Sequence, residues 1–549
     1  MEELPVLVVG AGPVGLALAV VLEHHGVACR IIDRADTPAR LSKASGIQAR
    51  TLEIFDELRL SGQLLDRGMR ITTAEVRSHG EVTARLDYDA IASDSRYPFM
   101  LGLPQSTTEA ILTERLADRG VVVERGVELG ECRQSDRGVT AILRDRDGSC
   151  ETVQARWIAG CDGPGSTVRA ALRIPHSGDE HRTSYALGDF EASSDLPHET
   201  AMLLLEDHGA MQLLPIAPER WRIAVECGPI RDFGRPPPPT TADLQRFCDR
   251  FLPEPARVRD VHWSTYYCVR HRRASPFRSG RAFLLGDAAS VHSPMTLQGM
   301  NAGIQDAWNL GWKLALAERG AATEVLLDSY DAERRDIDVR MTQSGGPVQR
   351  LIAVDDAPTR RANGVVRSFL ASLPGYERHI GLRTALASHG YRSSPAVEQR
   401  GSMPTKARSG DLAPDAPFTT DAGVRIRDGR SYVSLLFTGD ADRSDPRGPV
   451  DIPRPARLPI RSVLVTREPG VRAPRSGTSL VVDSGGGIHH AWGITRPTHV
   501  LVRPDGHIGW RSEPPDVPAF TRYLTRLHGT MAPDRPPVSG AARPERLAG

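Results

Sequence analysis

The sequence has few cysteines, almost no excess charge and no long apolar run. Its seven cysteines are odd in number and none forms a CxxC pair, which excludes a disulfide framework and the usual zinc spacing; we expect buried, small apolar residues instead. The 69 basic and 68 acidic residues nearly cancel, so no field favours nucleic acid or an anionic membrane. The apolar segment Leu16–Leu22 is far too short to cross a bilayer. We therefore expect a soluble cytoplasmic protein whose partners are small molecules.

The N-terminal segment, up to Arg34, is an ordered series of elements. An apolar strand at Val6–Val9 leads to a glycine turn, an apolar helix pattern follows, and a second apolar strand ends at Asp33. In such a unit Gly10 permits the turn, Gly12 lets the backbone approach a pyrophosphate, and Gly15 lets the helix pack on the strand. An acid about twenty residues further on accepts hydrogen bonds from a ribose diol. The segment predicts a dinucleotide-binding unit.

Two later segments repeat the pattern of an apolar strand that ends at a glycine turn. The strand at Trp157–Ala159 leads into Gly160-Cys161-Asp162-Gly163. The strand at Ala282–Leu285 leads to Gly286-Asp287, and a long helix is expected from near Ala302. A strand that delivers Gly-Asp to a helix N-terminus is a second site for phosphate and sugar. The N-terminal unit and this second site are separated by strand-like sequence. Together they favour a large dinucleotide, and FAD fits better than NAD.

The intervening sequence predicts further helices and strands. An apolar stripe predicts a helix over Gly46–Leu60. A second helix is expected over Ser106–Arg119, with Ser106 as N-cap and Glu109 completing a capping box. Val121–Leu143 alternates as a meander of strands. Strand-like sequence from Thr183 to Arg270 suggests an inserted sheet domain.

Three segments together resemble the class A flavoprotein monooxygenases, the single-component FAD-dependent aromatic hydroxylases: Gly10–Gly15, Cys161–Gly163 and Gly286–Asn301. Tyr330–Arg335 also resembles the Tyr-x-x-Glu-Arg sequence that closes that family's FAD domain. The likeness covers nearly the whole chain. It is greatest to the longer actinobacterial members, which tailor aromatic polyketides and carry a third, thioredoxin-like domain.

The resemblance implies an α/β fold: a Rossmann-type FAD-binding domain with an inserted β-sheet substrate domain, followed by a thioredoxin-like domain. Ser431–Phe437 and Val500–Trp510 match core strands of that third domain. Because no cysteine follows Cys268, the third domain cannot exchange disulfides, and a structural or homodimer-forming role is expected. The expected boundaries are a discontinuous FAD-binding domain within residues 1–400 (about 1–72, 104–175 and 275–400), substrate-sheet insertions at about 73–103 and 176–274, and a thioredoxin-like domain at 401–549 whose tail is disordered from about residue 530.

The resemblance assigns the contacts of the adenosine half one residue at a time. Asp33 stands where the family has its ribose acid, although glutamate is usual there, and Arg34 is the basic neighbour. Lys43 stands where an arginine commonly contacts the ribose and pyrophosphate. Lysine keeps the positive charge but cannot donate the two parallel hydrogen bonds of a guanidinium. Leu129 is expected to give a backbone contact to the adenine.

On the flavin half, Gln105 matches a flavin-side glutamine, and Asp162 matches the acid that serves both FAD and the pyridine nucleotide. Asp287 resembles the acid on the ribityl chain, while Met300 and Asn301 resemble backbone amides that face the flavin pyrimidine edge. The complete set of expected cofactor-binding residues is Gly10, Gly12, Pro13, Val14, Gly15, Asp33, Arg34, Lys43, Gln105, Leu129, Asp162, Asp287, Pro294, Gly299, Met300 and Asn301.

One segment departs from the family. Relatives commonly read Pro-x-Gly-Gly-Gln-Gly after the Gly-Asp strand, whereas this chain has Thr296 and Leu297 in place of the two glycines. Glycines at these positions allow close backbone approach and loop movement beside the flavin ring. Because both are replaced here, we expect either that flavin movement is restricted or that the flavin is bound differently. The loop residues Pro294, Thr296 and Leu297 are the candidate catalytic residues, and no catalytic base is assigned.

Tyr185, Tyr266 and Tyr267, in the expected inserted sheet, could activate a phenol, but core packing is the preferred interpretation of all three. His292 is the one histidine inside a motif, and a plain loop role is preferred for it too.

The implied activity is oxygenation of a polycyclic aromatic substrate of the polyketide type. NADPH or NADH would reduce FAD, and reduced flavin would capture molecular oxygen as a C4a-hydroperoxide that hydroxylates the ring. Baeyer–Villiger insertion, epoxidation and ring cleavage of the same substrate class are alternatives. A flavin-binding scaffold protein of a biosynthetic complex is an alternative of another class. No metal is expected.

Overall fold

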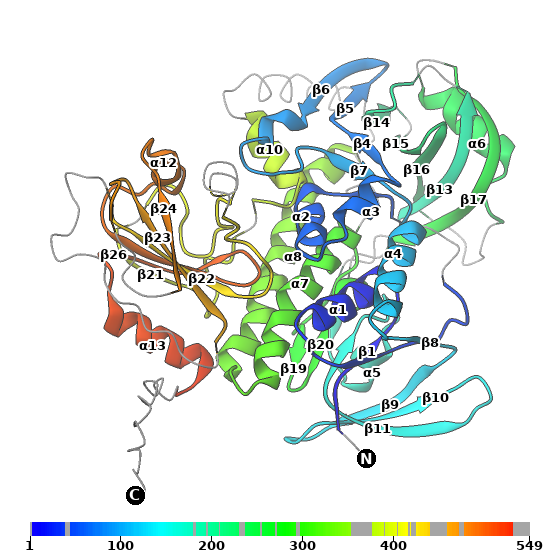
Figure 1. Ribbon diagram of the computed structural model, residues 1–549. Coiled ribbons are helices and arrows are strands. Elements are labelled where there is room, and N and C mark those ends of the chain that lie inside the picture. Colours follow the sequence, from blue (N-terminus) through cyan, green and yellow to red (C-terminus); the bar gives the residue numbers. More distant parts are fainter. Residues whose placement is uncertain are drawn as a thin grey trace, which may run out of the picture.

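In the computed structural model most strands belong to three large sheets, and helices lie between these sheets (Figure 1). The structure describes residues 3–38, 44–178, 183–193, 196–207, 209–229, 237–252, 255–269, 272–292, 297–352, 376–388, 390–402, 404–415, 418, 424–439, 458–471 and 477–530. The tail that the sequence predicts to be disordered, from about residue 530, lies outside the described residues.

The first sheet has eight strands and contains the N-terminal segment. Its parallel core runs in the order β20-β11-β1-β2-β8; β19 pairs with β20 at one edge, and β10 and β9 extend β11 as an antiparallel ribbon. The strands are β1 (Leu4–Val9), β2 (Cys29–Asp33), β8 (Val123–Arg125), β9 (Glu128–Gln134), β10 (Val139–Arg144), β11 (Cys150–Gly160), β19 (Arg278–Ser279) and β20 (Ala282–Leu284). Because the core strands are parallel, their C-terminal ends meet at one edge, which brings the residues after β1, β2, β11 and β20 together.

Helices pack against this sheet and against one another. The longest ones are α1 (Pro13–His24), α4 (Gln105–Ala117), α7 (Gly299–Glu318) and α8 (Glu324–Ile352), and α2 (Ala49–Glu57), α3 (Ser61–Leu65) and α5 (Thr167–Ala171) are shorter. α1 and α7 approach closely because α7 has glycines at the contact. A Cβ on Gly303 would lie 2.4 Å from Val14 Cγ2, and one on Gly311 would lie 2.3 Å from Val21 Cγ1. Larger residues at these positions would push the two helices apart.

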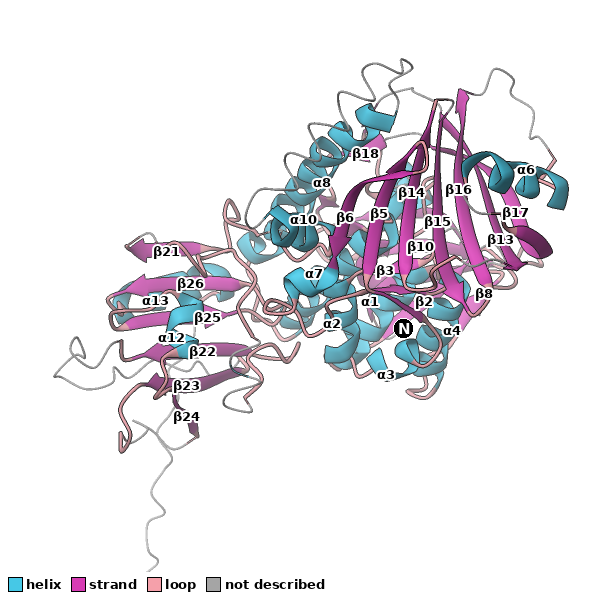
Figure 2. Ribbon diagram, turned by 90° about the horizontal axis from the view of Figure 1, so that it is seen from above, coloured by secondary structure: helices cyan, strands magenta, loops and turns pink. Residues whose placement is uncertain are grey.

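The second sheet has seven strands in the order β17-β13-β16-β15-β14-β5-β6. Its strands are β5 (Thr73–Ser78), β6 (Glu81–Asp87), β13 (Thr183–Ser193), β14 (Thr200–Glu206), β15 (Gly209–Ala217), β16 (Arg220–Pro229) and β17 (Arg257–Val269). Helix α6 (Thr241–Phe251) packs on one face, as Figure 2 shows. Side chains on a strand alternate between faces, so Ala186, Phe190 and Ile223 meet α6, while Tyr185, Leu187 and Ala224 form a separate apolar cluster on the opposite face.

Two small sheets join the larger ones. One has the order β3 (Gly46–Ile47), β7 (Met100–Gly102), β4 (Met69–Ile71), and the other pairs β12 (His176–Gly178) with β18 (Arg272–Ala274). A Cβ on Gly102 would lie 2.1 Å from the carbonyl oxygen of Pro215, so β7 packs directly against β15. Short 3-10 helices, η1 (Tyr88–Ile91) and η2 (Gly286–Ala288), and α10 (Tyr376–Thr384) complete this part.

The C-terminal sheet has six strands in the order β21-β26-β25-β22-β23-β24. It comprises β21 (Glu398–Gly401), β22 (Tyr432–Phe437), β23 (Ile460–Thr466), β24 (Thr478–Val482), β25 (Thr498–Val502) and β26 (Ile508–Glu513), with helices α12 (Gly487–Trp492) and α13 (Val517–His528). The two segments expected to be core strands of a third domain are strands here. That this domain is thioredoxin-like stays a prediction.

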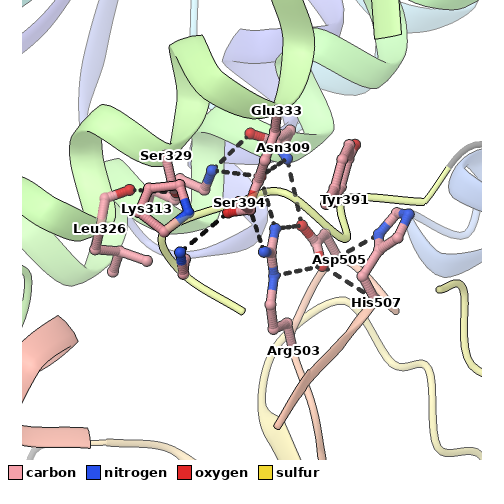
Figure 3. Close-up of polar contacts among 12 residues, drawn as sticks. Asn309, Lys313, Leu326, Ser329, Glu333, Tyr391, Ser394, Arg503, Asp505 and His507 are labelled. Atoms are coloured by element: carbon pink, nitrogen blue, oxygen red, sulfur yellow. Dashed lines mark hydrogen bonds and ion pairs between the residues drawn. The ribbon is translucent and has the colours of Figure 1, made fainter. Parts of the chain in front are cut away.

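A buried cluster of charges joins the C-terminal sheet to α7 and α8 (Figure 3). Glu333 of α8 accepts hydrogen bonds from both terminal nitrogens of Arg503, at 2.6 and 2.9 Å, and from Nζ of Lys313 at 2.8 Å. Asp505 neutralises Arg503 from its other side. All four side chains are at most 1 % exposed. Arg503 and Lys313 hold the pKa of Glu333 well below its usual range, although burial alone would raise it. The glutamate of the Tyr-x-x-Glu-Arg sequence, Glu333, therefore joins the C-terminal sheet to the two helices. We call these four charged residues the junction cluster.

Two local expectations are wrong. Helix α4 begins at Gln105, and Ser106 is exposed inside the first turn, so it is not the N-cap. Glu109 instead accepts a hydrogen bond from Gln105 Nε2 at 2.7 Å, because the side chain of Gln105 reaches the next turn of the helix. Of the cysteines, Cys150 and Cys227 are exposed and not buried, although all seven are free thiols.

Among the helices of the described ranges, no stretch is both long and apolar enough to cross a membrane.

Candidate active site

Two neighbouring cavities lie at the edge where the core strands of the first sheet end. We call them the Asp33 cavity, of about 330 Å³, and the Asp287 cavity, of about 250 Å³. Gly12, Gln105, Cys161 and Gly163 line both, so the two form one continuous site. The Asp33 cavity is further lined by Gly10, Asp33, Arg34, Glu109, Arg125, Leu129 and Asp162, and the Asp287 cavity by Pro13, Val14, Tyr267, Asp287, His292, Leu297, Gly299 and Met300.

The three glycines after β1 have three different environments. Gly10 has φ = +100°, and a Cβ there would lie 2.5 Å from the carbonyl oxygen of Cys161, so only glycine fits this turn. A Cβ on Gly15 would lie 1.9 Å from the carbonyl oxygen of Gly10, so glycine also permits the close approach of helix and turn. At Gly12 nothing lies within 4 Å of such a Cβ. The backbone at Gly12, the N-cap of α1, therefore faces open space at a helix N-terminus, the environment that binds phosphate.

Asp33, at the end of β2, holds the turn as well as facing its cavity. Its carboxylate accepts hydrogen bonds from the backbone N–H of Ala11 at 2.7 Å and of Ala35 at 2.8 Å. Arg125, from the end of β8, lies 3.8 Å from the same carboxylate, and its Nη2 is buried with no hydrogen-bond partner. Glu109 lines the same cavity, and burial raises its pKa. The Asp33 cavity therefore presents the carboxyl groups of Asp33 and Glu109 and the guanidinium of Arg125 to a ligand.

Asp162 closes the wall between the two cavities. Its Oδ2 accepts hydrogen bonds from the N–H groups of Thr167, at 2.6 Å, and Val168, at 3.3 Å, at the start of α5. Its Oδ1 is buried with no partner. Burial raises the pKa of this carboxyl group. A buried carboxylate oxygen without a donor lacks a hydrogen bond that a ligand hydroxyl can supply.

The Asp287 cavity is bounded by η2 and the first turn of α7. Gly299 and Met300 open that helix and line the cavity, where the first-turn N–H groups have no partner within the helix. Asn301 is fully buried behind them, and its side chain is bonded to the backbone of Gly46, Gln48 and Leu297. Asn301 thus holds the loop in place.

Leu297 takes a conformation that suits glycine. Its φ is +52°, in the left-handed region that costs a residue with a Cβ roughly 1–2 kcal/mol. Its side chain packs near Gly46, where an added Cβ would lie 3.3 Å from Leu297 Cδ1. The backbone at Leu297 therefore has a conformation that suits glycine, and the leucine side chain adds strain and an apolar surface. Lys43, Pro294 and Thr296 lie outside the described residues.

The sequence did not reveal Arg169. Its Nη1 donates to the carbonyl oxygen of Ala288 at 2.8 Å and its Nη2 to that of Pro164 at 2.7 Å, so it ties together the turns after β11 and β20. Ser166 caps α5 by accepting a hydrogen bond from the N–H of Arg169. No local pattern marks the side-chain role, because its partner Ala288 is far away in sequence.

Comparison with known proteins identifies this architecture. A family model described as an FAD binding domain matches residues 3–344. The chain belongs to this family. It is 34 % identical to 6-methylpretetramide 4-monooxygenase of Streptomyces rimosus, over 98 % of this chain and 96 % of the relative. It is 30 % identical to the 12-dehydrotetracycline 5-monooxygenase/anhydrotetracycline 6-monooxygenase of the same species, over 93 % and 95 %.

Among solved structures, an anhydrotetracycline hydroxylase from Streptomyces rimosus superposes with a TM-score of 0.71 at 26 % identity, covering 97 % of this chain and all of that one. The predicted α/β fold with an FAD-binding domain is confirmed, and the chain is an FAD-dependent monooxygenase.

The residues present fit FAD. The open space beside the backbone of Gly12 suits a pyrophosphate. In the Asp33 cavity, carboxylates can accept hydrogen bonds from the hydroxyl groups of a ribose. The unpartnered Asp162 Oδ1 supplies an acceptor in the Asp33 cavity, and the first-turn N–H groups of α7 supply donors toward the flavin half. The two cavities together give an elongated site for a dinucleotide.

Proposed function

We propose that this monooxygenase uses NADPH or NADH to hydroxylate a polycyclic aromatic substrate of the polyketide type. Bound FAD supplies the redox and oxygen chemistry, through a flavin C4a-hydroperoxide. The names of the Streptomyces relatives refer to pretetramide and tetracycline substrates, which supports this substrate class.

The observation that carries the proposal is the apolar face of the seven-stranded sheet beside the Asp287 cavity. Tyr267 of β17 lines that cavity and also packs in the cluster that contains Tyr185, Leu187 and Ala224. This is the face opposite α6. An apolar sheet face beside the flavin end of the site suits a flat aromatic ring system and keeps water away from the reacting atoms.

Of the three tyrosines considered from the sequence, Tyr266 packs with the cluster under α6, and Tyr185 is 3 % exposed in the core. Tyr267 alone among these three lines the Asp287 cavity. Burial raises the pKa of its phenol, so it stays protonated at neutral pH and can donate a hydrogen bond to a substrate oxygen.

The chain's own groups would hold and orient the reactants. The α7 first-turn amides and Asp287 would fix the flavin end, Asp33 would hold the adenosine end, and the sheet face would cover the substrate. Per turnover, NAD(P)H, one proton, dioxygen and an aromatic C–H would give NAD(P)⁺, a hydroxylated ring and water.

The test is a panel of polycyclic aromatic polyketides with the purified holoprotein. We expect stimulated NAD(P)H oxidation and a product that gains one atom of labelled dioxygen with its ring skeleton intact. Oxygen inserted into a ring bond, an epoxide or a cleaved ring would contradict hydroxylation. Absence of stimulated oxidation with every compound would favour a scaffold protein.

Replacing Leu297 with glycine is expected to speed anaerobic reduction of FAD by NADPH about tenfold. Glycine removes the side chain that packs near Gly46 and admits more backbone conformations, and lowering the barrier to movement by about 1.4 kcal/mol speeds it about tenfold. Stopped-flow absorbance measures the rate. Leu386→Gly is the matched control, because Leu386 has φ = +56° and packs in another cluster. Equal rates in both variants and the parent would leave Leu297 as part of the substrate wall.

We also propose a structural role for the C-terminal domain. Its sheet buries Tyr432, Leu501 and Trp510 against Trp312 and Leu326, which belong to α7 and α8. It therefore stabilises the two helices that complete the FAD-binding part.

A further inference from the structure

His292 lies between the flavin end of the site and a second, much smaller cavity. It lines the Asp287 cavity, and together with Ser290, Asp306 and Asp338 it also borders a cavity of about 10 Å³ between η2, α7 and α8. That volume is about the size that holds one water molecule. The imidazole, 13 % exposed, thus touches both the place where a flavin and substrate would meet and a compartment behind it.

A carboxylate holds the ring in this position. The Nε2 of His292 lies 3.0 Å from Oδ1 of Asp338 on α8. The other carboxylate oxygen of Asp338 accepts from Arg273 Nη1 at 3.1 Å, and Ser290 adds a further hydrogen bond. Asp338 is 6 % exposed, whereas Arg273 is 37 % exposed and reaches solvent from β18. With Nε2 facing Asp338, the second ring nitrogen, Nδ1, is where a proton can be exchanged.

Opposite charges favour the charged form of this imidazole. Burial alone would lower the pKa of His292, but the adjacent Asp338 and the more distant Asp287 and Asp306 raise it above its ordinary value. The groups that face this region come from every element around it: Asp287 from η2, Asp306 from α7, Arg334 and Asp338 from α8, Arg273 from β18 and Tyr267 from β17. Arg334 neutralises Asp306, and Arg273 partly neutralises Asp338.

We propose that His292 is the proton donor of the reaction, with Asp338 as the residue that positions it. This proposal rests on the proposed function, in which each turnover takes up one proton. The imidazolium of His292 gives that proton from Nδ1 to the Asp287 cavity. Nδ1 of the neutral ring then regains a proton from solvent, relayed by a water molecule in the small cavity. Asp338 stays ionised; it fixes the ring and stabilises its charged form, as a carboxylate does for a catalytic histidine.

The first test is the pH profile of product formation by the holoenzyme. Because donation needs the charged imidazole, the rate of the parent should fall as pH rises through the pKa of His292. His292→Gln should lose this dependence and form product roughly a hundredfold more slowly, which is the usual size of such a contribution. Asp338→Asn should keep the dependence and shift it to lower pH. His262→Gln is the control, since His262 is exposed on β17 and pairs with Glu191.

The second test needs no turnover. In histidine-labelled protein, NMR should show one imidazole with a raised pKa; that signal should be missing in His292→Gln and shifted to lower pH in Asp338→Asn. Both variants should bind FAD as the parent does, which separates proton donation from a structural role.

If His292→Gln binds FAD and keeps the parent's pH profile, the donor role is wrong while the proposed function stands. If the parent itself binds FAD but oxidises no NAD(P)H with any aromatic compound, the proposed function fails, and this proposal fails with it. If His292→Gln does not fold, the Asp338→Asn profile decides, and an unshifted profile overturns the proposal.

Discussion

Replacing Asp33 with alanine is expected to weaken FAD binding by about ten- to a hundredfold. Hydrogen bonds to a charged partner contribute roughly 1.5–3 kcal/mol, and each 1.4 kcal/mol is about tenfold in affinity. The carboxylate also holds the N–H of Ala11 at 2.7 Å, so its loss loosens the glycine turn. Fluorescence titration of the apoprotein with FAD measures the change.

Asp36→Ala is the matched control, because Asp36 is exposed in the loop after β2 and pairs with Arg146 at the surface. Titration with FMN separates the two halves of the site, since FMN lacks the adenosine that Asp33 is assigned to bind. The Asp33 variant should bind FMN almost as the parent does. An equal loss for FMN and FAD, or an unchanged affinity for FAD, would contradict the ribose assignment.

Replacing Arg503 with methionine is expected to lower the free energy of unfolding by about 3–5 kcal/mol. Removing one partner of a buried ion pair leaves the other charge uncompensated, and such losses are of that size. Here the carboxylates of Glu333 and Asp505 would remain, with Lys313 as the nearest remaining cation. In the parent, burial lowers the pKa of Lys313 to about 8, and the charge of Arg503 contributes to that shift. Urea denaturation followed by tryptophan fluorescence measures the loss.

The control for this variant is Arg526→Met, which removes an exposed pair with Glu398 on the same domain. Its side chain is 38 % exposed, so solvent screens the pair and the expected loss is below about 1 kcal/mol. Similar losses in the two variants would show that the buried cluster adds little to the stability of the junction.

The parts of the fold that follow from the sequence are those set by local rules. Gly10, Gly12 and Gly15 are separated by short, fixed intervals, and the strand before them and the acid after them lie within one βαβ unit, so the first sheet edge could be predicted. The helix that became α7 was expected from near Ala302 and begins at Gly299. The capping box at Ser106 failed because Gln105 satisfies Glu109 from inside the helix.

The parts that could not be predicted depend on residues far apart in sequence. Arg125 meets Asp33 only because β8 lies beside β2, and Asp338 meets His292 only because α8 passes behind η2. The left-handed backbone of Leu297 also escaped prediction, since leucine gives no local signal for it. Neither hydrophobic periodicity nor turn composition carries such information, because both describe one element at a time.

The junction cluster has a consequence for the order in which the protein can be completed during synthesis. Lys313 and Glu333 leave the ribosome long before Arg503 and Asp505, so the face formed by α7 and α8 carries hydrated charges until β25 has emerged. The FAD-binding part therefore reaches its final packing only after Asp505 has been made. Nascent chains that stop before Asp505 should expose Trp312 and Leu326, and such chains are expected to be targets for chaperones or proteases.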